Sequence, residues 1–295
     1  MTDVHGITFD RVKDAVSDLG WDPDGRRPID SALEDAIEDG TLVQVPPGTY
    51  AVSDVSRRKR VERFGIRGMG PDRSSVRFVP ADDEPGRIVA LRGGRGHLLA
   101  DFTVDFGPDR DRGALGIQAI PDDDLQIHRL AFEGFTPPNP HTQWKLYPAI
   151  RDEDGTGVIS DVTSTGPAHI TGHGGSRAFA GVFKQHEGIL TFRRCHVAND
   201  PGDGAVYSGR HGAVRFEDCL FENCAMAGIR TGGPDSWVKG CTIVVDVENA
   251  HPENTGTYEA TNGIYWDPGP SCRAGGLIED CDIVVKSSAA AQAAI

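Results

Sequence analysis

Three short stretches in the second half of the chain decide the fold: RRCHV at 193–197, EDCLF at 217–221 and KGCTI at 239–243. Each has two polar or turn-forming residues, then a cysteine, a variable residue and an apolar residue. The same pattern, mostly with another apolar residue in place of cysteine, extends toward both ends of the chain. Such a repeat is typical of stacked structural units. Its anchors are Phe102, Leu130, Val162, Cys195, Cys219, Cys241 and Cys281, separated by 28, 32, 33, 24, 22 and 40 residues.

A second ladder alternates with the first, and each of its pieces is a Gly or Ala followed by an apolar residue. Its intervals of 33, 32, 24, 23 and 35 residues lengthen and shorten together with those of the first ladder. Each unit therefore contains at least two short strands joined by turns of variable length. The pieces are Gly116-Ile117, Ala149-Ile150, Gly181-Val182, Ala205-Val206, Gly228-Ile229 and Gly263-Ile264.

Short strands at this period predict an all-β fold, a single-stranded right-handed parallel β-helix. Stacking places equivalent residues above one another at about 4.8 Å, so the four anchor cysteines are predicted to form an internal column of buried thiols. Cys224 and Cys272 lie off this ladder. A β-propeller blade needs about 40–45 residues, and a β-sandwich predicts no fixed register of Cys and Gly-apolar pairs, so both fit less well.

An α-helix is predicted ahead of the first coil, in PIDSALEDAIED at 28–39. Its apolar residues recur at helical spacing, Pro28 suits the first turn and Gly40 suits the stop. We expect this helix to cover the open end of the β-helix, as a solenoid cap does. The predicted organisation is one structural domain: an N-terminal segment and capping helix at 1–40, the β-helix at 41–288, and a tail or partial C-terminal cap at 289–295.

Several motifs near the N-terminus occur together: Asp22-Pro23-Asp24-Gly25, the helix at 29–37, Val45-Pro46-Pro47-Gly48-Thr49-Tyr50, and a glycine-bearing strand at 64–70. This block resembles the start of the pectate-lyase-like (pectin lyase fold) superfamily of right-handed parallel β-helices. The resemblance covers the cap closely and the coils from about 64 to 286 by pattern. It implies the fold but no single activity, because the superfamily contains lyases, glycoside hydrolases, epimerases and phage tailspikes.

The 295 residues have a formal charge of −14, from 30 Lys and Arg against 44 Asp and Glu. This acidity argues against nucleic acid as a partner. Together with the preference for Asp and Arg, it predicts a salt-adapted, haloarchaeal protein; a GC-rich genome would also favour Arg but explains the Asp excess less well. No membrane span or secretory signal is visible, so we expect a cytoplasmic protein, with an extracellular one left open.

An outward-facing column is predicted beside the second ladder, because the residue after each inward apolar residue points to solvent. Aromatic rings suit sugar rings, and arginine suits uronate carboxylates through paired hydrogen bonds. We therefore expect an acidic polysaccharide or oligosaccharide to lie along it; the alternative is a solvated sheet face. The predicted column is Gln118, Arg151, Phe183, Tyr207, Arg230 and Tyr265, and Arg210 joins the last five as a substrate-binding residue.

Candidate acids and bases lie beside this column. A glycoside hydrolase needs two carboxylates roughly 5–10 Å apart. The candidates are Asp152, Asp200, Asp203 and Asp267. A lyase or epimerase needs a base, from Lys184, His186 or His211, and a cation beside the developing enolate, which in a lyase could be Ca²⁺. No metal ligands are assigned. The predicted catalytic residues are Asp152, Lys184, His186, Asp203 and Asp267.

The leading prediction is a carbohydrate-active protein that cleaves an acidic polysaccharide (a polyuronate), as a polysaccharide lyase by β-elimination or as a glycoside hydrolase. The alternative is a non-catalytic β-helix used for glycan binding, adhesion or assembly. Two insertions, at 137–147 and 250–261, are expected to wall the binding groove. The sugar, the need for a metal and the oligomeric state, a homo-oligomer included, stay open.

Overall fold

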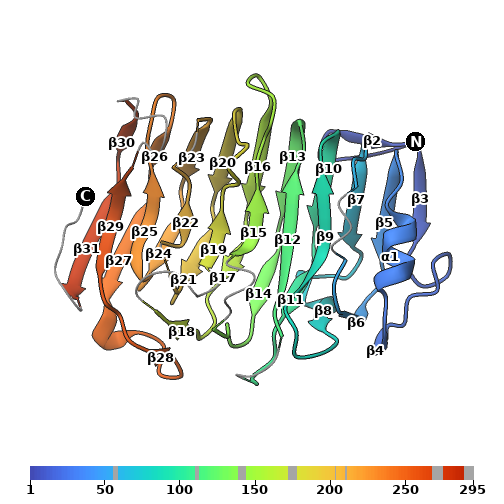
Figure 1. Ribbon diagram of the computed structural model, residues 1–295, viewed down its shortest axis with the longest axis horizontal. Helices are drawn as coiled ribbons and strands as arrows, with labels where there is room; N and C mark the ends of the chain where they lie inside the picture. The colour runs from blue at the N-terminus through green and yellow to red at the C-terminus, as the bar shows by residue number, and fades with distance from the viewer. Residues whose placement is uncertain are drawn as a thin grey trace.

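The computed structural model describes residues 1–55, 59–109, 113–138, 144–171, 178–202, 204–209, 211–267 and 275–288. Within these ranges the protein is mostly β, and its long sheets are parallel (Figure 1). The chain visits three sheets in rotation: β10 lies in sheet 1, β11 in sheet 2 and β12 in sheet 3, and β13 then returns to sheet 1. This arrangement is consistent with the predicted β-helix.

Neighbouring strands within each of the three sheets are parallel. Sheet 1 contains, in spatial order, β3 (Arg11–Asp14), β5 (Thr41–Val45), β7 (Phe64–Gly68), β10 (Arg95–Ala100), β13 (Asp123–His128), β16 (Thr156–Ser160), β20 (Ile189–Arg193), β23 (Ala213–Glu217), β26 (Trp237–Lys239) and β30 (Leu277–Glu279). Sheet 2 contains β4 (Asp24–Pro28), β6 (Gly48–Val52), β8 (Val76–Pro80), β11 (Thr103–Asp105), β14 (Ala131–Glu133), β17 (Thr163–Ser164), β21 (His196–Ala198), β24 (Leu220–Glu222), β27 (Thr242–Asp246) and β31 (Asp282–Ser287).

Sheet 3 is shorter and contains β9 (Gly86–Arg92), β12 (Leu115–Ile120), β15 (Trp144–Pro148), β19 (Ala178–Gly181), β22 (Val206–Tyr207), β25 (Met226–Thr231) and β29 (Thr261–Trp266). The remaining elements are the antiparallel pair β1 (Thr2–Val4) and β2 (Ile7–Phe9), the parallel pair β18 (His169–Ile170) and β28 (Thr255–Gly256), helix α1 (Asp30–Ala36), and the 3-10 turns η1 (Arg73–Ser75) and η2 (Val247–Asn249).

A sharp two-residue turn joins sheet 1 to sheet 2 in successive coils. Its first residue has a positive φ, as at Asp101 (66°), and its second is an anchor of the first ladder, as at Phe102, which is buried. Asp and Gly tolerate this left-handed conformation better than most residues. Strand pairing on both sides keeps the turns in register, which confirms the first ladder. We call their first residues the turn row: Asp101, Arg129, Asp161, Arg194, Asp218, Gly240 and Asp280.

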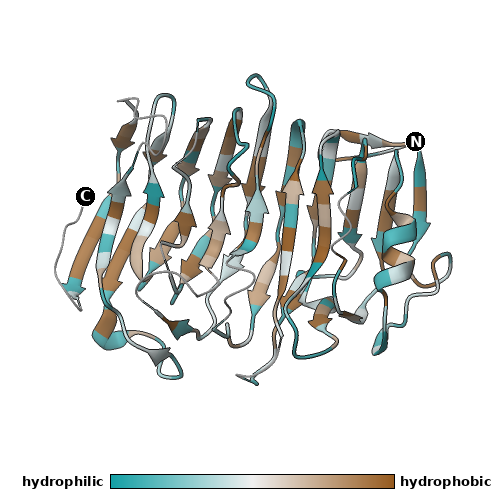
Figure 2. Ribbon diagram, viewed as in Figure 1, coloured by the Kyte–Doolittle hydropathy of each residue, from teal (hydrophilic) through white to brown (hydrophobic). Residues whose placement is uncertain are grey.

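The core is one continuous apolar cluster between the three sheets, visible as brown bands on successive strands in Figure 2. Phe192 and Phe216 of adjacent coils stack inside it with ring centroids 5.3 Å apart. Cys195, Cys219 and Cys241 are buried in the same cluster, which confirms the cysteine column for these three. Cys281 packs against the cluster but is only partly buried. The five described cysteines are free thiols, and Cys272 lies outside the described residues.

The N-terminal region differs from its prediction in two ways. The helix spans Asp30–Ala36 rather than 28–39, because Pro28 ends β4 and the backbone at Ile37 is extended. Strands also begin before residue 41, since β3 and β4 extend sheets 1 and 2. Leu33 and Ala36 of α1 are buried in the core. Among the described residues, no helix is long and apolar enough to cross a membrane.

Candidate functional site

The outward column on sheet 3 exists, with two of its predicted members replaced. Strand pairing places Tyr207, Arg230 and Tyr265 side by side in one row, as predicted. Gln118 lies in the same row and pairs with Tyr147, not with Arg151. Gly181 pairs with Tyr207 where Phe183 was expected. We call this set the sheet 3 row: Gln118, Tyr147, Gly181, Tyr207, Arg230 and Tyr265.

The register of two coils was therefore predicted wrongly. Ala149-Ile150 begins only after β15 ends at Pro148, and the inward residues of these coils are Leu146 and Ala180. Ile150 and Val182 are buried as well, but in the turns that follow the strands. A Gly-apolar or Ala-apolar pair thus occurs both in a strand and just after it, and sequence alone did not separate the two positions.

Trp144 completes the aromatic part of this face, although no sequence pattern singled it out. Its indole covers Gly181, where a Cβ atom would lie 2.6 Å from the indole Nε1. Its ring centroid lies 5.9 Å from that of Tyr207 and 6.4 Å from that of Tyr147. Phe183 contacts Tyr147 from the neighbouring turn, at 6.5 Å between centroids. Simple alternation in WKLY at 144–147 could not have placed these residues, because Lys145 and Leu146 are both buried.

Arg230 lies between two tyrosines of the sheet 3 row. Its guanidinium carbon is 4.4 Å from the ring centroid of Tyr207 and 5.1 Å from that of Tyr265. Nε donates to Oδ2 of Asp267 at 3.0 Å, and Nη2 forms an ion pair with the same oxygen at 3.0 Å. These contacts fix the guanidinium plane between aromatic faces, an arrangement in which cation–π attraction adds to the ion pair. The outermost ring, Tyr265, is 50% exposed.

The predicted residues Arg151 and Asp152 lie in the turn between sheets 3 and 1. Arg151 donates to Asp122 at 2.8 Å, and Asp152 accepts from Arg95 at 2.5 Å. Asp122 and Asp152 are therefore each engaged by an arginine. A cavity of about 430 Å³ lies beside these pairs and is lined by Arg151, Asp152 and Glu153 among others. A second cavity of about 360 Å³, lined by Glu153, Glu187 and His211 among others, lies next to it along these turns.

Asp152 and Asp267 do not form a pair of catalytic carboxylates. They follow β15 and β29, which are four strand spacings apart in sheet 3, or about 19 Å at about 4.8 Å each. Glycoside hydrolysis requires a separation of roughly 5–10 Å. The other predicted aspartate, Asp203, and the predicted binding residue Arg210 lie outside the described residues.

The two predicted bases next to the sheet 3 row have different environments. Lys184 is exposed in the turn after β19, whereas His186 is completely buried. The backbone N–H of Ile150 donates to Nδ1 of His186 at 3.1 Å, and Nε2–H donates to the carbonyl of Ala213 at 3.0 Å. These bonds hold three coils together at the turn, so the position of His186 is structural and closed to solvent.

A buried charged pair, Lys145 and Asp200, lies in the interior of the protein. Lys145 Nζ is 4.0 Å from Asp200 Oδ2 and donates to Ser164 Oγ at 2.7 Å. Burial raises the pKa of Asp200 well above its ordinary value, and the nearby Lys145 opposes that shift. Among the described residues neither carboxylate oxygen of Asp200 accepts a well-formed hydrogen bond. Asp200 therefore faces the interior and does not reach a ligand on sheet 3.

The described residues contain no group of three or more His, Cys, Asp or Glu side chains arranged to hold a metal ion. These residues therefore offer no fitting side-chain site for Ca²⁺.

No family model, curated protein or solved structure matches this chain.

Proposed function

We propose that the protein binds an extended acidic glycan along the sheet 3 row. The single observation behind this proposal is the position of Arg230 between Tyr207 and Tyr265 in the sheet 3 row. Aromatic faces bind the apolar faces of sugar rings, and a guanidinium held in a fixed plane binds a carboxylate. Trp144 and Tyr147 extend the aromatic surface further along the sheet.

Binding without cleavage is the form of this function that the described geometry favours. Asp152 and Asp267 are too far apart to act as a pair, and His186 is buried in backbone hydrogen bonds. Cleavage by elimination or hydrolysis stays a prediction from the sequence. Asp267 is the predicted catalytic residue that contacts the sheet 3 row, through Arg230. Binding and cleavage therefore need separate readouts.

We also infer three finer features: the hand of the β-helix, the role of α1 as a cap, and the cellular setting. A right-handed helix follows from the strong preference of parallel crossovers for that hand. Burial of Leu33 and Ala36 against the first coils supports α1 as an N-terminal cap. The resemblance of residues 22–50 to the pectate-lyase-like superfamily supports the same architecture. The free thiols are in keeping with a reducing, cytoplasmic setting.

Isothermal titration of the purified protein tests the proposed function. We expect binding to polygalacturonate or alginate but not to neutral dextran, and we expect Arg230→Gln and Tyr265→Ala each to weaken it at least tenfold. Arg215→Gln is the matched control. The guanidinium carbon of Arg215 also stacks on an aromatic ring, 3.9 Å from the ring centroid of Trp237, but this pair lies on sheet 1. Equal loss in all three variants, or no binding at all, would contradict the proposal.

The same mixtures are assayed for unsaturated products and new reducing ends. Cleavage that disappears in Asp267→Asn would show that the protein is an enzyme at this face. Binding without product formation would show a glycan-binding module.

A further inference from the structure

The N-terminal hairpin forms one wall of a cavity on the outer face of sheet 1. Apolar residues of β1 and β2 pack on Leu42 and Leu98, which fixes the hairpin to the sheet. His5, in the turn of the hairpin, stacks on His128 of β13 with ring centroids 4.0 Å apart and planes 12° apart. The cavity beside this stack measures about 420 Å³. It lies on a different sheet from the proposed glycan-binding face.

Arginines outnumber carboxylates in the lining of this cavity, in a chain whose formal charge is −14. Four arginines line it, at positions 67, 129, 193 and 194, against two carboxylates, those of Asp101 and Asp161. Two of the arginines and both aspartates come from the turn row, where acidic and basic residues alternate from Asp101 to Asp218. With both histidines neutral, the lining side chains have a formal charge of 4 − 2 = +2. Glu217, outside the lining, pairs with Arg193 at 2.6 Å.

The carboxylates of the cavity orient its arginines through ion pairs. Asp101 accepts from Arg67 Nε at 3.0 Å and from Arg129 Nε at 2.5 Å, so one acid orients two guanidinium groups. The side chain of Asp101 is 5% exposed, and that of Arg129 is 61% exposed. Arg194 is held in the same way, by Asp161 at 2.7 Å. The arrangement directs guanidinium groups to solvent with their planes fixed.

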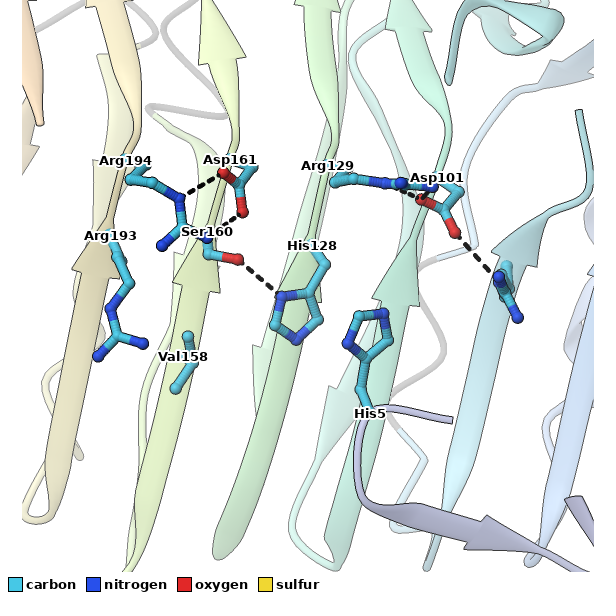
Figure 3. A pocket seen from close by; sticks show the side chains of 10 residues that line it. His5, Asp101, His128, Arg129, Val158, Ser160, Asp161, Arg193 and Arg194 are labelled. Carbon is cyan, nitrogen blue, oxygen red and sulfur yellow. Dashed lines mark hydrogen bonds and ion pairs between the residues drawn. The ribbon is translucent and has the colours of Figure 1, made fainter. Parts of the chain in front are cut away.

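The floor of the cavity is held by a chain of hydrogen bonds. Ser160 Oγ donates to His128 Nδ1 at 2.8 Å, and His128 Nε2–H donates to Gln126 Oε1 at 2.9 Å. Burial lowers the pKa of His128 to about 4, so its ring is neutral near pH 7. Figure 3 shows Arg193 and Arg194 on one side of Val158 and Ser160, with the two histidines and Arg129 on the other.

We propose that this cavity binds a tetrahedral oxyanion, a phosphate or sulfate group. Guanidinium groups reach it from two sides, which suits a group with several outward oxygens better than a flat carboxylate. The ion pairs orient these groups before a ligand arrives, which lowers the entropic cost of binding. A volume of about 420 Å³ also leaves room for the molecule to which a monoester group is attached.

Isothermal titration with inorganic phosphate, sulfate and glucose 6-phosphate tests this site, at constant ionic strength set with NaCl. We expect one site per chain, with affinity reduced at least tenfold in the double variant Arg193→Gln, Arg194→Gln and unchanged in Arg215→Gln. Tighter binding of glucose 6-phosphate than of phosphate would identify a monoester as the ligand; the reverse order would identify the free ion. Absence of binding by all three probes, or equal weakening in both variants, would overturn the proposal.

A measurement on the unmodified protein keeps the test independent of variant folding. The ring resonances of His5 and His128 are followed by NMR during titration with phosphate. We expect them to shift and saturate with phosphate but not with the same ionic strength of chloride. Saturating shifts confined to other parts of the protein would contradict the assignment of the site to this cavity.

Discussion

The indole of Trp144 occupies the space that a side chain at position 181 would fill, so Gly181 and Trp144 are fitted to each other across two adjacent coils. We expect Gly181→Ala to displace the indole and to lower the free energy of unfolding by about 1–3 kcal/mol. Urea denaturation measures the loss. In a Trp144→Ala background the same glycine substitution should cost almost nothing, and an undiminished cost there would show that the two residues are not coupled.

Removal of the His186 imidazole should destabilise the protein. His186→Ala leaves the N–H of Ile150 and the carbonyl of Ala213 without their buried partner, which costs about 2–4 kcal/mol. Lys184→Ala, at an exposed position two residues away, is the matched control and should change stability by less than about 0.5 kcal/mol. A His186→Ala protein as stable as the parent, yet deficient in glycan cleavage, would restore the catalytic interpretation of this residue.

Stability should fall as the pH drops from about 6.5 to about 4, because His5 and His128 both have pKa values below the ordinary value. The unfolded chain then binds more protons than the folded one, so each histidine stabilises the fold above pH 6.5 and loses that contribution on acidification. For His128 the shift corresponds to about 1–2 kcal/mol after solvent screening. His128→Gln should reduce the difference between the urea midpoints at pH 7 and pH 5. An unchanged difference between these midpoints would contradict the prediction.

Asp200 should contribute a pH dependence of the opposite sign. Its pKa is raised by burial, so the folded state retains a proton that the unfolded state releases above pH 4. Stability from this group is full below the ordinary carboxyl pKa and is lost as the pH rises through the raised one. Asp200→Asn should therefore gain stability relative to the parent as the pH rises toward 8. Parallel stability curves for parent and variant would show that Lys145 holds Asp200 ionised throughout.

The sequence predicted the coils well where a turn demands a special backbone. The first ladder is correct along its length, because a left-handed residue followed by a buried anchor leaves little freedom between Asp101 and Phe102 or between Asp218 and Cys219. Sheet 3 was harder to predict. The predicted insertion at 137–147 includes most of β15, which begins at Trp144. Leu146 and Ile150 are equally buried, so sequence alone could not tell which of them is the inward strand residue.

The cavity beside His5 and His128, which we propose as an oxyanion site, could not be predicted from the sequence. Residues 1–20 are only mildly amphipathic, and nothing in them indicates that His5 meets His128. The polar pairs before each anchor were recognised, but their ion pairs depend on which coil lies next to which. Charge partners of this kind become visible only when the stacking order is known.

The alternation of charge along the turn row also restricts how the protein can change length. Removing one coil, such as residues 129–160, would place Asp101 beside Asp161. Like charges would then meet on adjacent turns, one of them nearly buried. In this part of the molecule, the opposite charges of adjacent turns are kept only when coils are gained or lost in pairs. The charge order therefore disfavours the duplication or deletion of a single coil.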